Sequence, residues 1–195
     1  FGPTSATYLI TGGLGGLGLW TAQWLHDHGA THVVLVSRSG TVVDDHDGDV
    51  LKTLQNNMHV TVLACDVTRR TDVERTMAYM RQSLPPLRGI IHAVGVLSDA
   101  PFKEQTRDSW TKVLAPKVQG LKHLLACTRY DPIDVYVNYS SVAGVFGPRG
   151  QSNHAAANAT LDGMTAWLQW LGLGACAMQW GPWENIGYAS RVGSG

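Results

Sequence analysis

The sequence lacks an excess of charge of either sign, because 15 lysines and arginines balance 15 aspartates and glutamates. A chain without surplus positive charge has no general attraction for nucleic acid or for an anionic membrane. It also lacks an apolar run of the ~18 to 20 residues that cross a bilayer, and its first residues lack the charged start of a signal peptide. We therefore expect neither a nucleic-acid partner nor a membrane partner.

Cysteine is scarce as well. Cys65, Cys127 and Cys176 are widely separated, form no C-x-x-C pair and lie within apolar runs. This pattern predicts reduced, interior thiols in a cytoplasmic protein and indicates no metal site.

An initiator methionine is absent too, and the chain finishes in Gly-Ser-Gly, so we interpret it as a piece of a longer polypeptide. With 44% hydrophobic and only 15% charged residues, it has enough apolar material for one core and too little charge for a disordered segment. Residues 1–195 are therefore expected to form a single domain.

Short β-branched runs alternate with longer segments of helical spacing along almost the whole chain. The predicted strands are 7–11, 32–36, 60–64, 89–93, 135–139 and 175–179. The predicted helices are 16–28, 49–57, 71–83, 109–128 and 152–171, with surface connections at 41–49 and 85–86. Strands that are apolar on both faces and separated by helices predict an α/β fold with a doubly wound parallel sheet.

The first predicted strand runs directly into a glycine-rich turn and then a helix. In a doubly wound sheet this turn binds a pyrophosphate, because glycines allow close backbone approach and the helix N-terminus presents free N–H groups. We assign the whole turn to cofactor binding: Thr11, Gly12, Gly13, Leu14, Gly15, Gly16, Leu17 and Gly18.

The residues after the second strand indicate which dinucleotide binds. An acidic side chain there would bind a ribose hydroxyl, but this chain has Ser37 and Arg38. A guanidinium binds a 2′-phosphate and stacks on adenine, so the pair favours NADPH over NADH, unless Arg38 is simply a solvated charge.

Two further segments should lie at the same edge of the sheet. Asp66 and Val67 follow the third strand, and Ala93 and Gly95 follow the fourth. Asp66 can accept a hydrogen bond from the adenine amino group, although each of these residues also suits an ordinary turn.

Eight segments together resemble the ketoreductase domain of modular polyketide synthases and animal-type fatty acid synthases, a short-chain dehydrogenase/reductase module with a Rossmann fold. The matching segments are Tyr8-Leu-Ile-Thr-Gly-Gly-Leu-Gly-Gly-Leu-Gly18, Leu35-Val-Ser-Arg-Ser-Gly40, Cys65-Asp-Val67, His92-Ala-Val-Gly-Val96, Leu114-Ala-Pro-Lys-Val118, Ser140-Ser-Val-Ala-Gly144, Ala155-Ala-Ala-Asn158 and Trp180-Gly-Pro-Trp183.

The resemblance implies NADPH-dependent reduction of a β-ketoacyl thioester to a β-hydroxyacyl thioester, in polyketide or fatty acid biosynthesis. The acyl chain would be tethered through phosphopantetheine to an acyl carrier protein domain. The resemblance also implies neighbouring synthase domains, including an upstream structural subdomain, and a C-terminal lid and last strand that this chain does not contain.

The family's catalytic serine, lysine and asparagine match Ser141, Lys117 and Asn158. In the family the serine holds the carbonyl oxygen, a tyrosine protonates the forming alkoxide, and the lysine supplies a cation. At the tyrosine position this chain has His154, four residues before Asn158 and hence on the same helix face.

Three interpretations of His154 remain open at this point. In the first, the imidazole donates the proton itself. In the second, the domain binds NADPH as a reduction-impaired structural module, since loss of a general acid costs ~10² to 10⁴ in rate. In the third, another hydroxyl donates the proton, and Tyr139 is the nearest aromatic hydroxyl in sequence. Lys117 and an oxidised nicotinamide would lower the pKa of the imidazole and keep it mostly neutral.

The family also implies a stereochemical outcome. An aspartate after the fourth strand marks the B-type, and a tryptophan in the loop after the catalytic serine marks the opposite type. Asp99 is present, Phe146 stands in the loop, and the segment reads Leu97-Ser-Asp99 where the family has a second aspartate. These residues favour the B-type.

Overall fold

The computed structural model describes residues 6–42 and 45–183. Its strands are β1 (Thr7–Thr11), β2 (His32–Ser37), β3 (His59–Ala64), β4 (Leu87–His92), β5 (Val135–Ser141) and β6 (Ala175–Trp180). Its helices are α1 (Gly16–Asp27), α2 (Asp45–Asn57), α3 (Arg70–Ser83), α4 (Arg107–Leu114), α5 (Gly120–Cys127), α6 (Ala143–Phe146) and α7 (Ser152–Trp170). A 3₁₀ turn, η1 (Phe102–Glu104), precedes α4, and a π-helical turn, η2 (Ala115–Gln119), joins α4 to α5.

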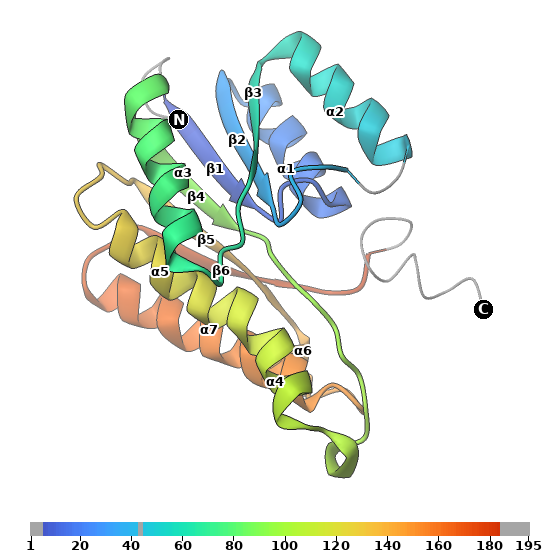
Figure 1. Ribbon diagram of the computed structural model, residues 1–195. Coiled ribbons are helices and arrows are strands. Elements are labelled where there is room, and N and C mark those ends of the chain that lie inside the picture. The colour runs from blue at the N-terminus through green and yellow to red at the C-terminus, as the bar shows by residue number, and fades with distance from the viewer. Residues whose placement is uncertain (1–5, 43–44, 184–195) are drawn as a thin grey trace.

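The six strands form one parallel sheet in the order β3-β2-β1-β4-β5-β6 (Figure 1). The strand order reverses between β1 and β4, so the loops after these two strands diverge at the carboxyl edge, where ligands bind in folds of this kind. The prediction of a doubly wound α/β fold is confirmed.

Side chains that alternate along the strands supply two hydrophobic cores, one on each face of the sheet. Ile10 of β1 belongs to the core under α1 and α2, with Leu19 and Leu54. Leu9 belongs to the core under α3, α5 and α7, with Leu124 and Leu168. Figure 1 shows these two groups of helices covering the sheet from opposite sides. Within the described parts of the chain, no helix is both long and apolar enough to span a membrane.

The predicted continuous helix over 109–128 is wrong in one respect, because η2 interrupts it. Pro116 lies in this turn; it has no N–H to donate, and its ring clashes with the carbonyl four residues earlier in a regular α-helix. The wider π turn relieves that conflict, and such turns occur often at functional sites. Lys117 is the next residue in the turn.

Two other predictions need correction. The surface connection predicted over 41–49 gives way to α2 at Asp45, where Asp45 and Asp47 occupy the first turn and interact favourably with the positive end of the helix dipole. Cys65 is buried as predicted, but Cys127 is half-buried and Cys176 is exposed. Cys176 is exposed because β6 is an edge strand of the described sheet.

Candidate active site

The glycine-rich turn after β1 is shaped so tightly that a Cβ does not fit at Gly12, Gly13 or Gly18. Gly12 has φ +67°, and a Cβ there would lie 3.0 Å from the carbonyl oxygen of Ala93. A Cβ on Gly18 would lie 2.6 Å from the Gly12 carbonyl oxygen. The helix α1 that follows has no side-chain cap at Gly15 in the described part of the chain, so its first N–H groups are available to a phosphate. The turn therefore fits a dinucleotide.

Two residues assigned to this turn, Thr11 and Leu14, have side chains that pack in the interior. The Thr11 side chain is fully buried, and its hydroxyl lies 2.8 Å from His92 Nδ1. Leu14 is 4% exposed and packs in the core under α1. These two side chains face away from solvent, whereas Gly15 is exposed and Gly16 and Leu17 are half-buried.

Ser37 and Arg38 lie beside the turn, because Gly13 N donates to the Val36 carbonyl at 3.1 Å. The Ser37 hydroxyl accepts from Gly40 N at 3.0 Å and shapes the loop. Arg38 is exposed and makes no hydrogen bond or ion pair within the described residues. Its guanidinium is therefore available to a ligand at the end of β2.

The segments after β3 and β4 leave the same carboxyl edge of the parallel sheet. The Asp66 carboxylate accepts from the N–H and the hydroxyl of Thr68, at 2.9 and 2.7 Å, and so forms a turn. Val67 is buried. Ala93 N donates to the Thr11 carbonyl at 3.1 Å. A Cβ on Gly95 would lie 3.7 Å from Lys117 Cε, which places Gly95 next to the predicted catalytic lysine.

Lys117 is 5% exposed, and its ammonium donates to the Tyr139 carbonyl at 2.7 Å. Burial lowers the pKa of Lys117 to about 8, and Asp162 opposes that shift. The π turn places this cation beneath the end of β5. A lysine at this position stays largely charged at neutral pH and raises the local positive potential.

His154 and Asn158 face each other on α7, as their spacing predicted. Asn158 Nδ2 donates to the His154 carbonyl at 2.8 Å and lies 3.1 Å from His154 Nε2. An amide nitrogen donates and does not accept, so Nε2 is the accepting nitrogen and the proton of the neutral ring resides on Nδ1. Nδ1 is buried and has no hydrogen-bond partner in the described structure. The ring therefore presents an unused N–H donor.

Burial and the Lys117 charge lower the pKa of His154 to about 4, and Asp99 opposes the shift. The imidazole is neutral at physiological pH, which agrees with its accepting a hydrogen bond at Nε2. The sequence-based expectation of a neutral imidazole is consistent with this environment.

Ser141 ends β5 and keeps its hydroxyl hydrogen available. The Ser141 hydroxyl accepts from Ala143 N at 3.1 Å and has no acceptor of its own in the described structure. A Cβ on Gly144 would lie 3.0 Å from Ala159 N, so α6 packs closely on α7. The loop after Ser141 is thereby held against the helix that carries His154 and Asn158.

Tyr139 does not share this site. Its hydroxyl lies 2.6 Å from the Thr21 hydroxyl on α1, on the opposite face of the sheet from α7. Burial raises the pKa of Tyr139. The geometry therefore disfavours the interpretation in which Tyr139 replaces the missing tyrosine as proton donor.

The two residues predicted to influence the stereochemical outcome, Asp99 and Phe146, are both exposed. Asp99 is exposed and accepts from Gln151 Nε2 at 2.7 Å. Phe146 is 79% exposed at the end of α6, just before Gly147 turns the chain with φ +60°.

Three residues of this region went unassigned in the sequence: His92, Gln105 and Asn153. Their side chains form hydrogen bonds between segments that are far apart in the chain. In the sequence, each of them is only a polar residue in an apolar strand or near the start of a helix, which does not identify its partner. No group of three or more potential metal ligands occurs in residues 6–42 and 45–183.

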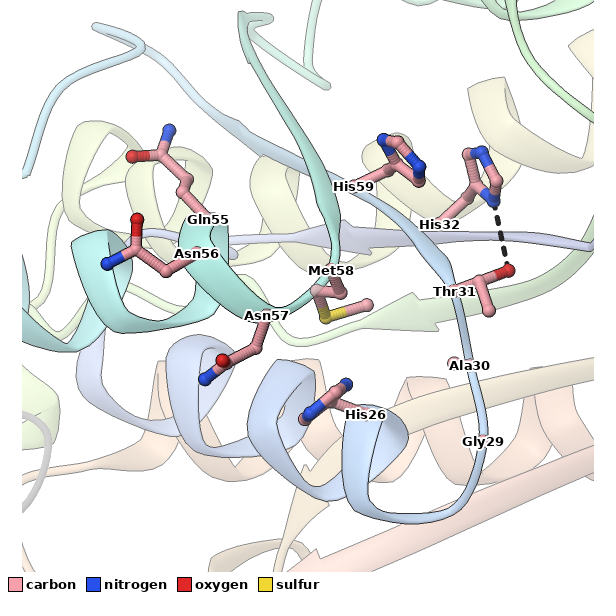
Figure 2. A pocket seen from close by; sticks show the side chains of 10 residues that line it. All are labelled: His26, Gly29, Ala30, Thr31, His32, Gln55, Asn56, Asn57, Met58 and His59. Carbon is pink, nitrogen blue, oxygen red and sulfur yellow. Dashed lines mark hydrogen bonds between the residues drawn. The ribbon is translucent and has the colours of Figure 1, made fainter.

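A separate cavity of about 610 Å³ lies at the other edge of the sheet. Figure 2 shows His26, His32 and His59 among its lining residues, near the starts of β2 and β3. The His32 and His59 rings stack with centroids 4.6 Å apart. Because the cavity is at the amino ends of the strands, it is distinct from the predicted site at their carboxyl ends.

Comparisons with known proteins identify the family of this chain. A family model described as the KR domain matches residues 6–185. A phenolphthiocerol/phthiocerol polyketide synthase protein of Mycobacterium tuberculosis is 39% identical over 96% of this chain and 10% of that protein. The highly reducing polyketide synthase phiA of a fungal species is 36% identical over 95% of this chain and 7% of that protein. The chain thus spans a tenth or less of these relatives.

Solved structures show the same fold. A ketoreductase domain from the bacillaene assembly line superposes with a TM-score of 0.88 and 30% identity, over 98% of this chain and 47% of that one. An A-type ketoreductase from a modular polyketide synthase superposes with a TM-score of 0.86 and 34% identity, over 96% of this chain and 40% of that one. Because the family model covers most of the chain and these relatives and structures agree with it, the chain belongs to the ketoreductase domain family of polyketide synthases, within the short-chain dehydrogenase/reductase superfamily.

Proposed function

We propose that this chain reduces the β-carbonyl of an acyl thioester with NADPH as the hydride donor. The acyl chain would arrive on the phosphopantetheine of an acyl carrier protein domain within a multidomain synthase. Membership of the ketoreductase family supports oxidoreductase chemistry with a nicotinamide cofactor. The exposed Arg38 beside the glycine-rich turn supports the preference for the 2′-phosphate of NADPH.

The observation that carries the proposal is the unused donor of His154. Its Nδ1 is buried and has no hydrogen-bond partner among the described residues, and Asn158 orients the same ring through Nε2. A buried N–H without a partner is costly, so such a group is a natural donor for a ligand oxygen. A neutral imidazole that polarises a carbonyl is an established catalytic device.

The residues then divide the chemistry of one step. The Ser141 hydroxyl and His154 Nδ1–H donate to the carbonyl oxygen and stabilise the negative charge that develops there. The cofactor, when bound, supplies the hydride to the β-carbon. The His154 proton passes to the alkoxide oxygen, which completes the hydroxyl, and the ring regains a proton from solvent. Lys117 stabilises the ring while it lacks that proton.

The test is NADPH oxidation with a small β-ketoacyl thioester, measured on the whole ketoreductase domain that carries these residues. NADPH binding is confirmed first by fluorescence. The native domain is compared with His154→Tyr and His154→Phe, and with His26→Phe as a control at the far edge of the sheet. We expect native turnover comparable with that of His154→Tyr, and a loss of ~10² to 10⁴ in His154→Phe.

The same experiment decides the competing function. If NADPH binds tightly but only His154→Tyr turns over, His154 is not a working donor. The native domain is then a reduction-impaired module that holds its cofactor and supports its neighbours.

A further inference from the structure

Asn153 is fully buried at the start of α7, yet it takes no part in the proposed chemistry. Its Nδ2 donates to the Ser98 carbonyl at 2.8 Å and to Gln105 Oε1 at 3.0 Å. Its Oδ1 accepts the backbone N–H of His154 at 2.7 Å. A single amide therefore binds the loop after β4 on one side and the backbone of His154 on the other.

Gln105 completes this connection from the loop side. Its Nε2 donates to the Ala100 carbonyl at 3.1 Å, and its Oε1 accepts from the Ser109 hydroxyl at 2.6 Å as well as from Asn153. The carbonyl acceptors fix the orientation of both amide groups, because only the NH₂ end can donate to them. We refer to Gln105 and Asn153 together as the amide bracket.

The segment that the amide bracket holds is the loop 98–105. Two further hydrogen bonds connect this loop to the residues just before α7. Ala100 N donates to the Gly150 carbonyl at 2.9 Å, and Gln151 Nε2 donates to the Asp99 carboxylate at 2.7 Å. The loop is thus bound to the start of α7 both by the amide bracket and by these two hydrogen bonds. A buried polar network with its donors and acceptors satisfied selects one arrangement of the segments it joins.

The position of this loop bears on which face of a ketone is reduced. If Ser141 and His154 hold the carbonyl oxygen, turning the ketone over exchanges its two faces while the oxygen stays in place. Only the placement of the two carbon substituents then distinguishes the faces. The loop 98–105 lies beside His154, through Asn153, so its spacing from α7 limits where one substituent can go.

We infer that the amide bracket sets the spacing between the loop 98–105 and His154 and thereby determines which face of the substrate ketone is reduced. Gln105 and Asn153 are positioning residues under this inference and do not touch the reacting atoms. The inference rests on the proposed ketoreduction for its substrate. The inference assigns stereochemical selectivity to the pair Gln105 and Asn153 rather than to one exposed residue such as Asp99.

The variants separate the two sides of the bracket. Asn153→Asp keeps the acceptor for the His154 N–H and removes both donors to the loop. Gln105→Ala removes the loop side and leaves Asn153 intact. Asn138→Ala is the matched control, because Asn138 is equally buried and donates at 2.9 Å to Thr165 of the same helix, away from the loop. Each variant is made in the native and the His154→Tyr domain.

The main measurement is the ratio of the two β-hydroxy products by chiral chromatography, with the thermal midpoint recorded for every variant. We expect Asn153→Asp and Gln105→Ala to lower the product ratio roughly fivefold or more, a change of ~1 kcal/mol between competing transition states. We expect kcat to fall ~10- to 100-fold, since a displacement near 1 Å costs this much. Asn138→Ala should lose thermal stability and keep the native ratio.

An unchanged ratio in both bracket variants overturns the inference, as does an equal change in Asn138→Ala. If neither the native nor the His154→Tyr domain reduces any ketone, the proposed function is refuted, and this result does not by itself test the amide bracket. The bracket is then judged by NMR titration of His154, whose flanking charges are Lys117 and Asp99. A loosened loop admits water and raises the pKa of His154 toward its ordinary value, whereas an unmoved midpoint refutes the bracket.

Discussion

His92 makes the stability of this fold depend on pH. Its ring is 1% exposed and joins two segments of the site: Nε2 donates to the Lys117 carbonyl at 2.9 Å, so Nδ1 accepts from the Thr11 hydroxyl at 2.8 Å. Donation to Lys117 requires a proton on Nε2, and acceptance from Thr11 requires that Nδ1 carry none, so the two bonds together select the neutral ring. Burial, reinforced by the Lys117 charge, lowers the pKa of His92 to about 4.

The sign and size follow from linkage. Between pH 6.5 and pH 4, His92 binds a proton in the unfolded state, where its pKa is near the ordinary 6.5, but stays unprotonated in the folded state. The stability that the neutral ring contributes is present above pH 6.5 and is lost as the pH falls toward 4, below which the loss levels off. With these two pKa values, the free energy of unfolding should fall by about 2 kcal/mol between pH 7 and pH 5 on account of His92 alone.

The assay is urea unfolding of the whole domain at pH 7, 6 and 5, followed by tryptophan fluorescence, for the native protein and His92→Gln. A glutamine amide can accept from Thr11 and donate to Lys117 but does not titrate. Subtracting the two curves cancels the other titrating groups, His154 included. A variant whose stability falls with pH as steeply as the native protein would refute the assignment of the pH dependence to His92.

Two further changes test the site. Tyr139→Phe should leave the reduction rate within about twofold and cost ~1 kcal/mol of stability, because it removes only the hydrogen bond to Thr21; a rate loss near 100-fold would make Tyr139 the proton donor. Arg38→Asp should weaken NADPH binding ~10- to 100-fold, the worth of a charge-assisted hydrogen bond, while NADH binding holds or improves. Fluorescence titration with both cofactors checks this, and an equal loss for both would contradict the role of Arg38.

Local sequence carried most of the fold and part of the site. The spacing of apolar residues predicted each described strand, and the strand-turn-helix context identified the glycine-rich turn. The i, i+4 relation of His154 and Asn158 predicted their contact, and the structure places Nε2 and Nδ2 3.1 Å apart. These features depend on neighbours within about one helical turn, so a single sequence is enough to read them.

The partnerships across the fold were beyond such reasoning. Thr11 and His92 are 81 residues apart, and Asn153 and Ser98 are 55 apart. Neither pair follows a local pattern, and the π turn at Lys117 breaks the helix that periodicity predicted.

The sequence by itself determined the alternation of strands and helices, the phosphate-binding turn and the identities of the residues that can do chemistry. Only the tertiary structure decided which proton His154 offers, that Lys117 is buried, that Cys176 is exposed and that Asn153 binds the loop 98–105. The physical reason is that protonation and burial depend on which segments become neighbours in the sheet. That adjacency arises from the strand order of the whole domain, which no local run of residues specifies.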